Sequence, residues 1–182
     1  MTGAQMIVQV LADEGTTAIF GYSGGAILPT YDAVFLFNQE QGERGGQQMP
    51  LIVPANEQGA GFMAAGYARA SGRVGVCLVT SGPGATNTVT PVRDCMADSV
   101  PMIVISGQVK RATCLATTPV PGLRQLGDQE GDIVPMARGI TKYAAVVERA
   151  EDIAWHLDQA LHHALGGRPG PVTASRRSPP AA

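Results

Sequence analysis

The sequence predicts an α/β domain of three layers, in which helices cover both faces of a mainly parallel central sheet. Short apolar runs alternate along the chain with segments of helical periodicity. The run VGVCLVT, residues 74–80, has no polar alternation, as expected for a strand that is buried on both faces. Glycine loops lead from several of these runs into helices, which is typical of parallel sheets with helical crossovers.

The first part of the chain contains two helical and two strand patterns. AQMIVQVLADEG, residues 4–15, has apolar positions at helical spacing and stops at a glycine cap. TTAIF, residues 16–20, predicts a strand, and GYSGGAILPTYDAV, residues 21–34, predicts a glycine loop followed by a helix. Residues 39–49 are polar and rich in glycine, which is typical of a surface loop, and PLIVPA, residues 50–55, predicts the next strand.

The middle of the chain repeats this alternation. NEQGAGFMAAGYARA, residues 56–70, predicts a closely packed helix, and SGPGATN, residues 81–87, predicts a glycine loop that opens another helix. VPMIVIS, residues 100–106, and ITKYAAVV, residues 140–147, predict strands. Residues 107–130 show little periodicity, and a long loop of this kind in a compact domain is usually functional.

The last part of the chain combines a clear helix with an unexpected tail. The amphipathic segment at residues 150–165 predicts a helix with one apolar face. That face consists of Ile153, Leu157, Ala160, Leu161 and Ala164. GRPGPV, residues 167–172, should lead into another strand, but TASRRSPPAA, residues 173–182, is basic, rich in proline and not strand-like.

The composition favours one globular domain and excludes several classes of function. The 182 residues are 45% hydrophobic and 15% charged, which allows a sizeable core. A net charge of −2 without a Lys/Arg stripe predicts no nucleic-acid partner. The apolar runs are too short to cross a membrane. The low charge indicates that a partner chain or domain covers part of the surface.

The cysteines and histidines predict no metal site. Cys77, Cys95 and Cys114 lack the spacing of metal ligands or of a CxxC motif. Their odd number and scatter, without a signal peptide, indicate reduced thiols and a cytoplasmic location. The three histidines lie on the last predicted helix, where His162 and His163 are adjacent and point in different directions, so we expect them to be solvated.

Polar residues gather at one predicted edge of the sheet. Ligands of open parallel sheets bind beyond the carboxyl ends of the strands. The loops GYSGG, ANEQG, TSGPGATN and SGQV are expected there. We expect them to form one site that carries Glu57, Thr80, Asn87 and Gln108.

The residues alone leave the roles at this edge open. Asn56 is a good N-cap, and an acid in the first turn, such as Glu57, gains up to about 1 kcal/mol from the helix dipole. The small residues that follow indicate instead that another surface approaches closely, where a carboxylate can hold or share a proton. The loop at 81–87 suits either phosphate binding or a tight turn, and Lys142 suits either a surface charge or an anion contact.

Seven motifs occur in order along the chain. They are FGYSGGAILPTYDAV, NEQGAGFMAAGYARASG, GVCLVTSGPGATN, ADSVPMIVISGQV, QEGDIV, ITKY and GRPGPV. Together they closely resemble the N-terminal, pyrimidine-binding domain of thiamine-diphosphate enzymes of the acetolactate synthase group. The resemblance implies that residues 1–172 form this domain. Residues 173–182 are then a disordered tail foreign to the family, left by a truncation or a frame change.

The resemblance implies a role for each matching residue. Thiamine diphosphate binds between two domain types at a dimer interface, and this domain contacts only the pyrimidine half. Glu57 matches the catalytic glutamate, which hydrogen-bonds the N1′ ring nitrogen and promotes deprotonation of the thiazolium carbon. The positions that match cofactor-binding residues are Tyr22, Gly25, Thr80, Pro83, Asn87 and Gln108. Tyr22 and Gly25 are expected near the cofactor or the dimer contact, and Gln108 is expected to face the substrate. Gln129, Glu130 and Lys142 match the region of the substrate channel and flavin pocket.

Four departures from the family pattern leave specificity and flavin contacts open. Ser23 stands where the family usually has proline, and Asn56 stands where it usually has histidine. The motif GTDAFQE becomes PGLRQLGDQE, without the phenylalanine. Pro91 falls inside the predicted helix after SGPGATN, where it removes a backbone donor and would kink or restart the helix.

The sequence lacks the GDG motif of the diphosphate-binding domain. We therefore expect an inactive part of an enzyme that decarboxylates pyruvate and joins the product to a 2-keto acid. Magnesium and FAD are expected only in the full-length enzyme. The expected partners are a second copy or a diphosphate-binding domain or subunit, together with a small 2-keto acid. The alternatives are an assembly module that pairs with a separate diphosphate-binding subunit, and an unrelated nucleotide-binding domain.

Overall fold

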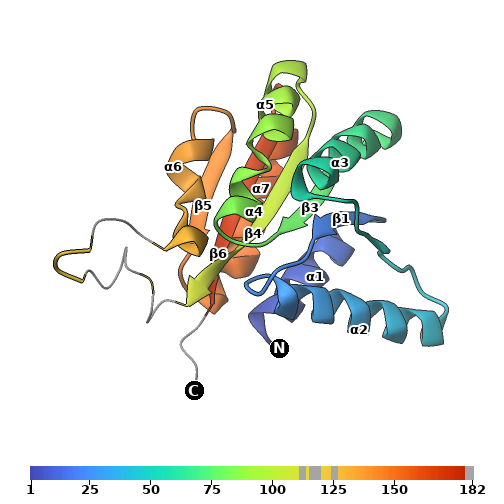
Figure 1. Cartoon of the computed structure of the whole chain (residues 1–182). Helices are drawn as coiled ribbons and strands as arrows, with labels where there is room; N and C mark the ends of the chain where they lie inside the picture. The colour runs from blue at the N-terminus through green and yellow to red at the C-terminus, as the bar shows by residue number, and fades with distance from the viewer. Residues whose placement is uncertain (111–113, 115–119, 124–126, 179–182) are drawn as a thin grey trace.

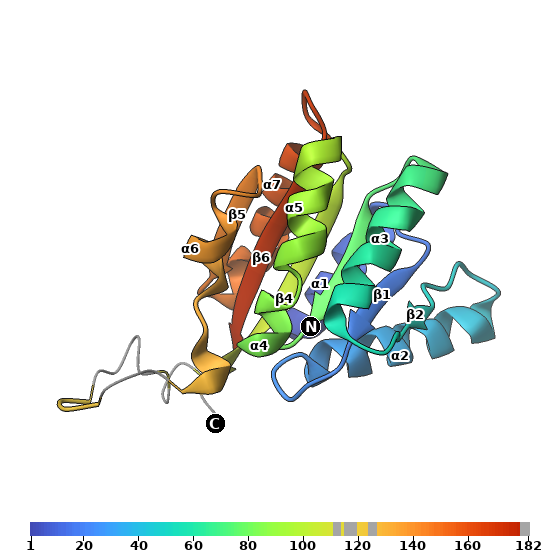
Figure 2. The same ribbon diagram turned by 45° about the horizontal axis from the view of Figure 1, so that its top comes forward.

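The computed structural model describes residues 1–110, 114, 120–123 and 127–178. Within these residues, six strands form one sheet in the order β2-β1-β3-β4-β6-β5, and every neighbouring pair is parallel. Helices cover both faces of the sheet (Figures 1 and 2). The predicted three-layer α/β fold is confirmed, and the sheet is parallel throughout.

The elements follow the predicted order. The strands are β1 (Ile19–Tyr22), β2 (Leu51–Ile52), β3 (Gly75–Val79), β4 (Met102–Lys110), β5 (Tyr143–Val147) and β6 (Pro171–Ser178). The α-helices are α1 (Gly3–Asp13), α2 (Leu28–Arg44), α3 (Glu57–Ser71), α4 (Pro83–Thr86), α5 (Val89–Asp98), α6 (Ile133–Ala137) and α7 (Ile153–Leu165). Short 3₁₀ turns are η2 (Asp128–Glu130) and η3 (Ala150–Asp152).

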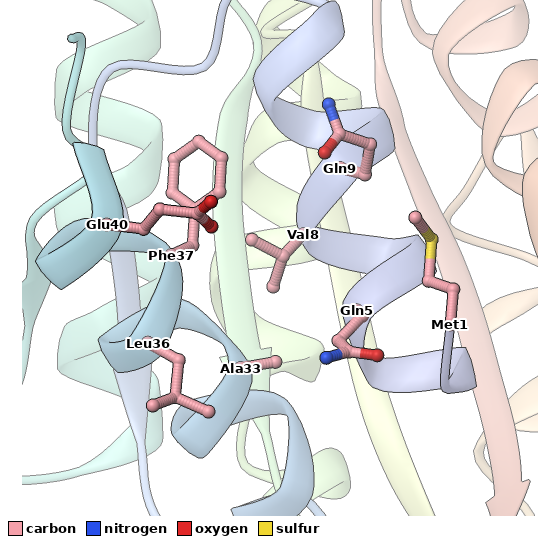
Figure 3. Close-up of a pocket in the computed structure, with 8 residues that line it drawn as sticks. All are labelled: Met1, Gln5, Val8, Gln9, Ala33, Leu36, Phe37 and Glu40. Carbon is pink, nitrogen blue, oxygen red and sulfur yellow. The ribbon is translucent and has the colours of Figure 1, made fainter. Parts of the chain in front are cut away.

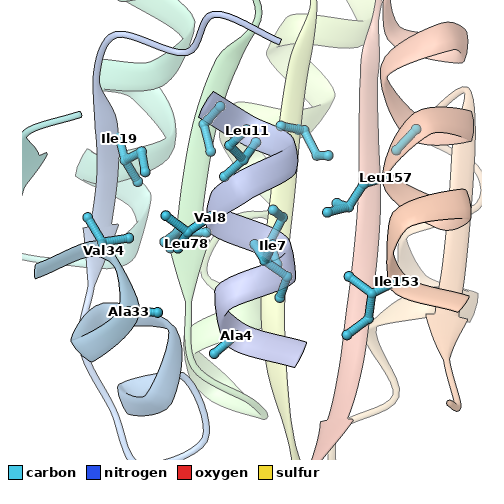
Figure 4. Packing of buried hydrophobic residues seen from close by; sticks show 14 of the residues in the cluster. Ala4, Ile7, Val8, Leu11, Ile19, Ala33, Val34, Leu78, Ile153 and Leu157 are labelled. Atoms are coloured by element: carbon cyan, nitrogen blue, oxygen red, sulfur yellow. The ribbon is translucent and has the colours of Figure 1, made fainter. Parts of the chain in front are cut away.

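A hydrophobic cluster lies on each face of the sheet. Figure 4 shows the cluster under α1, α2 and α7, where Leu11, Leu78 and Leu157 are buried. The opposite cluster lies under α3, α5 and α6 and contains Cys77 and Val104. Successive side chains of β3 thus point to opposite faces, and all of its residues are buried, as VGVCLVT predicts.

The ends of α1 and α3 have the caps that their sequences predict. The side chain of Asn56 accepts a hydrogen bond from the backbone N–H of Gly59 at 2.8 Å, which caps α3. The helix ends at Gly72, which has a φ of 70°. Gly15, with a φ of 72°, follows the end of α1 in the same way. The predicted apolar face of α7 is also confirmed, because all five of its residues are buried.

Pro91 restarts the helix, as predicted. The segment after β3 divides into α4 and α5, and Pro91 is the third residue of α5, where its missing N–H leaves no hydrogen bond unmade. Gly61 on α3 provides the room for this ring, since a Cβ at Gly61 would lie 2.5 Å from Pro91 Cγ. The two helices can therefore pack closely.

The predicted surface loop at residues 39–49 is wrong in its first half. The helix α2 continues to Arg44, whose guanidinium lies 2.7 Å from the carboxylate of Glu40 one turn earlier. Such a pair and the straight-chain residues around it favour a helix. The chain leaves the helix only at Gly45, which has a φ of 68°.

The tail at residues 173–182 also differs from its prediction. Residues up to Ser178 continue β6, which pairs with β4 on one side and β5 on the other, so the expectation of a disordered, non-strand segment is wrong there. Strand pairing on both sides outweighs a composition that disfavours strands. Residues 179–182 lie outside the described residues, and the foreign origin of the tail stays a prediction.

Two smaller predictions need correction. The strand β4 continues to Lys110, so the long loop begins later than residue 107. Parts of that loop, including residues 124–126 of the altered motif PGLRQLGDQE, lie outside the described residues. Two of the histidines are not simply solvated, because His156 Nδ1 lies 2.7 Å from the hydroxyl of Tyr143 and the ring of His163 stacks on the same tyrosine.

Candidate functional site

The carboxyl ends of four parallel strands bring the predicted site together. Glu57 begins α3 just after β2, and Thr80 follows β3 directly. Gln108 lies near the end of β4, and Gly25 lies in the loop after β1. Because the strands are parallel, these positions share one edge of the sheet.

A hydrogen bond joins Glu57 to Asn87. The Nδ2 of Asn87 donates to Oε2 of Glu57 at 2.8 Å, although the two residues are 30 positions apart. A Cβ at Gly84 would lie 3.2 Å from the other carboxylate oxygen, Oε1, and 2.6 Å from Cγ2 of Thr80. A glycine at this position therefore allows α4 to approach both side chains.

The Glu57 carboxylate faces a cavity of about 590 Å³. Its lining combines polar groups with an apolar proline ring. The lining residues are Glu57, Thr80, Pro83, Gly84, Thr86, Asn87 and Gln129. The predicted residues Glu57, Thr80, Pro83 and Asn87 therefore do come together.

A second cavity of about 620 Å³ lies beside the first and shares Thr80 and Gln129 with it. Its other lining residues are Gly24, Gly25, Ala26, Ser81, Gln108, Val109 and Lys110. Gln108 and Gly25 thus lie on the neighbouring cavity. Tyr22, at the exposed end of β1, is in the lining of neither.

Gln108 is held firmly in place. Its side chain is 7% exposed, its Nε2 donates to the carbonyl of Gly131 at 3.3 Å, and its Oε1 accepts from the backbone N–H of Val109 at 2.9 Å. Buried amides with paired atoms have little freedom to rotate. Gln108 therefore forms a fixed part of the lining of the second cavity.

Gln129 was not among the predicted binding residues, although it borders both cavities. Its Oε1 accepts a hydrogen bond from the buried Ser81 hydroxyl at 3.3 Å. Gly82, with a φ of 56°, lets this segment approach, because a Cβ there would lie 2.3 Å from the carbonyl oxygen of Asp128. From the sequence, the family resemblance matches Gln129 to the region of the substrate channel and flavin pocket, and the long loop that contains it is of predicted functional character.

Tyr31 lies behind the site as a neutral phenol. Its hydroxyl donates to the carbonyl of Leu78 at 3.2 Å. Burial raises the pKa of Tyr31 far above its usual value, and the nearby Cys77 and Glu57 raise it further. The hydroxyl therefore remains a hydrogen-bond donor over the whole physiological pH range.

The other candidates lie apart from these cavities. Lys142 donates from Nζ to the carbonyl of Gly166 at 2.5 Å, at the carboxyl end of α7, where a cation is favoured by the helix dipole. In the described part of the chain, no group of three or more His, Cys, Asp or Glu residues could hold a metal ion. All three cysteines are buried, and no helix among the described residues is long and apolar enough to cross a membrane.

A further cavity of about 290 Å³ lies between α1 and α2 (Figure 3). Its polar side chains already have partners. Gln5 accepts from the backbone of Thr2, Gln9 donates to Asp13, and Glu40 pairs with Arg44. Each polar side chain that lines this cavity thus already forms one interaction within or next to its own helix.

A parallel α/β sheet with polar residues at the carboxyl ends of its strands is typical of domains that bind a ligand at that edge. The chain matches the family model described as thiamine pyrophosphate enzyme, N-terminal TPP binding domain, over residues 1–136, and it belongs to this family. The resemblance seen in the seven motifs is confirmed.

Curated relatives of this chain include acetolactate synthase subunits. The chain is 42% identical over 172 residues to the mitochondrial acetolactate synthase catalytic subunit of Saccharomyces cerevisiae. It is 43% identical to the acetolactate synthase large subunit of Haemophilus influenzae and 40% identical to the acetolactate synthase isozyme 2 large subunit of Escherichia coli, each over 172 residues. Each alignment covers 94% of this chain but only 22%, 27% and 28% of these relatives, respectively. The chain thus spans about a quarter of their length.

Proposed function

We propose that this chain binds the pyrimidine half of thiamine diphosphate through Glu57. The observation that carries the proposal is the Glu57 carboxylate, which faces a cavity of about 590 Å³ while Asn87 occupies only one of its oxygens. The other oxygen can share a proton with a ring nitrogen, either by donating to it as the carboxylic acid or by accepting from the protonated ring as the carboxylate. The cavity combines this acceptor with polar groups and the apolar ring of Pro83, which suits a small heterocycle.

The remaining site residues have supporting roles in this proposal. Thr80, Pro83 and Asn87 line the pyrimidine side, and Gln108 and Gly25 line the neighbouring cavity, where a 2-keto acid would react. Tyr22 would lie at the contact with the partner. Thiamine diphosphate supplies an electron sink for decarboxylation when it is bound. Glu57 contributes by holding or sharing a proton at the ring nitrogen.

We also propose that a partner covers the surface next to Glu57. Large apolar side chains are exposed on α2, just after β2 and on α3, and large exposed apolar surfaces often mark protein interfaces. They include Leu28, Phe35, Leu36, Val53, Phe62 and Met63. The partner would be the diphosphate-binding domain of a second copy of the longer enzyme, which would also bring magnesium and FAD.

A separately encoded diphosphate-binding subunit is the alternative partner, and this chain would then be an assembly module. In both cases the chain alone would be inactive, and the full enzyme would convert pyruvate to a 2-acetohydroxy acid. The cytoplasmic location stays a prediction, since the named yeast relative is mitochondrial. An assay of the pure chain with pyruvate, thiamine diphosphate and Mg²⁺ is expected to show no turnover. Turnover at enzyme-like rates would contradict the proposal that this chain holds only part of the active site.

Binding of thiamine's pyrimidine half, 4-amino-5-hydroxymethyl-2-methylpyrimidine, tests the proposal directly. In an NMR titration, we expect saturable shifts of the residues that line the first cavity. The substitution Glu57→Gln should abolish these shifts because an amide cannot share a proton with the ring nitrogen in the same way. Glu40→Gln, on the exposed face of α2, is the matched control and should bind normally. Binding of ATP or NAD at this cavity, without binding of the pyrimidine, would contradict the proposal.

A further inference from the structure

Asn87 lines the first cavity and also forms a hydrogen bond with Glu57, the predicted catalytic residue. On the basis of the proposed function, we infer that Asn87 is a positioning residue that orients the Glu57 carboxylate and does not bind the pyrimidine ring directly. Its Nδ2 donates to Oε2 of Glu57 at 2.8 Å, which is the length of a charge-assisted hydrogen bond. This bond connects the end of α4 to the first residue of α3.

The backbone of α4 fixes where this amide can reach. The backbone N–H of Asn87 donates to the carbonyl of Pro83 at 2.9 Å, which closes the single turn of α4. Gly84 of the same turn lies against Glu57 Oε1, with only 3.2 Å between that oxygen and the position of a Cβ. The residues of one short helix therefore lie close to both carboxylate oxygens: Asn87 donates to Oε2, and the missing Cβ of Gly84 leaves room for Oε1.

This arrangement determines what kind of ligand Glu57 can bind. Because the Asn87 amide already donates to Oε2, a ligand in the cavity meets no competition from this amide at Oε1. That geometry favours a heterocycle that presents a single ring nitrogen to the carboxylate. An amidine or guanidine, which binds a carboxylate through two parallel N–H donors, would have to share Oε2 with the Asn87 amide. Asn87 thus contributes to ligand choice through Glu57.

The side-chain amide of Asn87 itself reports on the hydrogen bond. We expect its exchange with water, measured by ¹⁵N NMR in the pure chain, to be about threefold or more slower than in Glu57→Ala, because the bond protects it. Asn87→Asp assigns the resonance by removing it. Gln9, which donates to Asp13 at 2.7 Å on the exposed face of α1, is a matched amide–carboxylate pair, and Glu57→Ala should not change its exchange. Equal exchange of the Asn87 amide in the two proteins would overturn the inference.

A double-mutant cycle then separates positioning from direct contact. The affinity for 4-amino-5-hydroxymethyl-2-methylpyrimidine is measured in the parent chain, Glu57→Gln, Asn87→Ala and the double variant. If Asn87 acts through Glu57, Asn87→Ala weakens binding about tenfold in the parent but less than about twofold in the Glu57→Gln background. Gln9→Ala should leave the affinity unchanged.

The outcomes of the cycle are distinct. An equal loss in both backgrounds would place Asn87 on the ligand itself and overturn the inference. A parent chain that does not bind the pyrimidine would contradict the proposed function instead. The exchange measurement, which needs no ligand, would then decide alone whether Asn87 orients Glu57.

Discussion

The strands β3 and β6 both lie inside the sheet, each between two parallel neighbours, yet their sequences differ sharply. β3 reads GVCLV and is wholly buried, as expected for a strand that is covered on both faces. β6 reads PVTASRRS and buries Thr173 and Ser175 at the corresponding depth. The comparison indicates that pairing on both sides can hold a strand in the sheet even when part of its buried surface is polar.

Strand β6 buries polar side chains, which costs free energy of folding, whereas β3 buries none. Ser175 on β6 is directly opposite Ser106 on β4, and neither hydroxyl has a hydrogen-bond partner among the described residues. Arg176 is half-buried, and desolvation lowers the pKa of its guanidinium. Buried polar groups without partners destabilise a fold. We therefore expect the loss of buried apolar atoms to destabilise the fold in either strand, and the loss of an unpaired hydroxyl on β6 to stabilise it.

The largest effect is expected in β3. Leu78→Ala should lower the free energy of unfolding by about 2–5 kcal/mol, because it leaves a cavity in a fully buried cluster. Ala174→Gly on β6 is the counterpart, since Leu78 and Ala174 both pair with Ile105 and lie on one face. It removes a single methyl group and should cost about 1 kcal/mol. Urea unfolding followed by circular dichroism measures both, and a larger loss for Ala174→Gly would contradict the comparison.

The second prediction concerns alkaline pH. Burial raises the pKa of the Cys77 thiol in β3 to about 12, from an ordinary value of 9.0. Between these values the unfolded chain binds fewer protons, so the stability present below pH 9.0 is lost as the pH rises toward 12. The slope from this one group is at most about 1.4 kcal/mol per pH unit.

Cys77→Ala should therefore reduce the loss of stability above pH 9.0, measured by urea unfolding at a series of pH values. Arg176→Met in β6 is the contrasting variant. Desolvation lowers the pKa of Arg176 from its ordinary value of 12.5, but the guanidinium stays charged at neutral pH. The free-energy cost of burying this charge is therefore the same at pH 6 and at pH 8. This variant should shift stability equally at pH 6 and pH 8. An unchanged alkaline slope in Cys77→Ala would show that other groups, such as Cys95, dominate the titration.

The contrast between β3 and β6 also explains which features could be predicted from the sequence. β3, the cap at Asn56 and the apolar face of α7 depend on local patterns, and all three were predicted. β6 depends on pairing with strands from elsewhere in the chain, which its own composition does not reveal. The same holds in the site, where parallel topology predicted that Glu57 and Asn87 share an edge. Their hydrogen bond depends on the close approach of α4, which no local pattern shows.

The smallest effect is expected from the two facing serines, and its sign is the most informative. Ser175→Ala should raise the free energy of unfolding by about 1 kcal/mol, because it removes a buried hydroxyl that forms no hydrogen bond. Thr88 is the matched control, since its equally buried hydroxyl donates to the carbonyl of Ala85 at 2.7 Å. Thr88→Val should lower the free energy of unfolding by about 1 kcal/mol. Ser106→Ala in the Ser175→Ala background should add less than it does alone, because in-register neighbours are coupled. If Ser175→Ala destabilised the chain as much as Thr88→Val, its hydroxyl would have a partner in solution, and β6 would be stabilised by more than its backbone pairing.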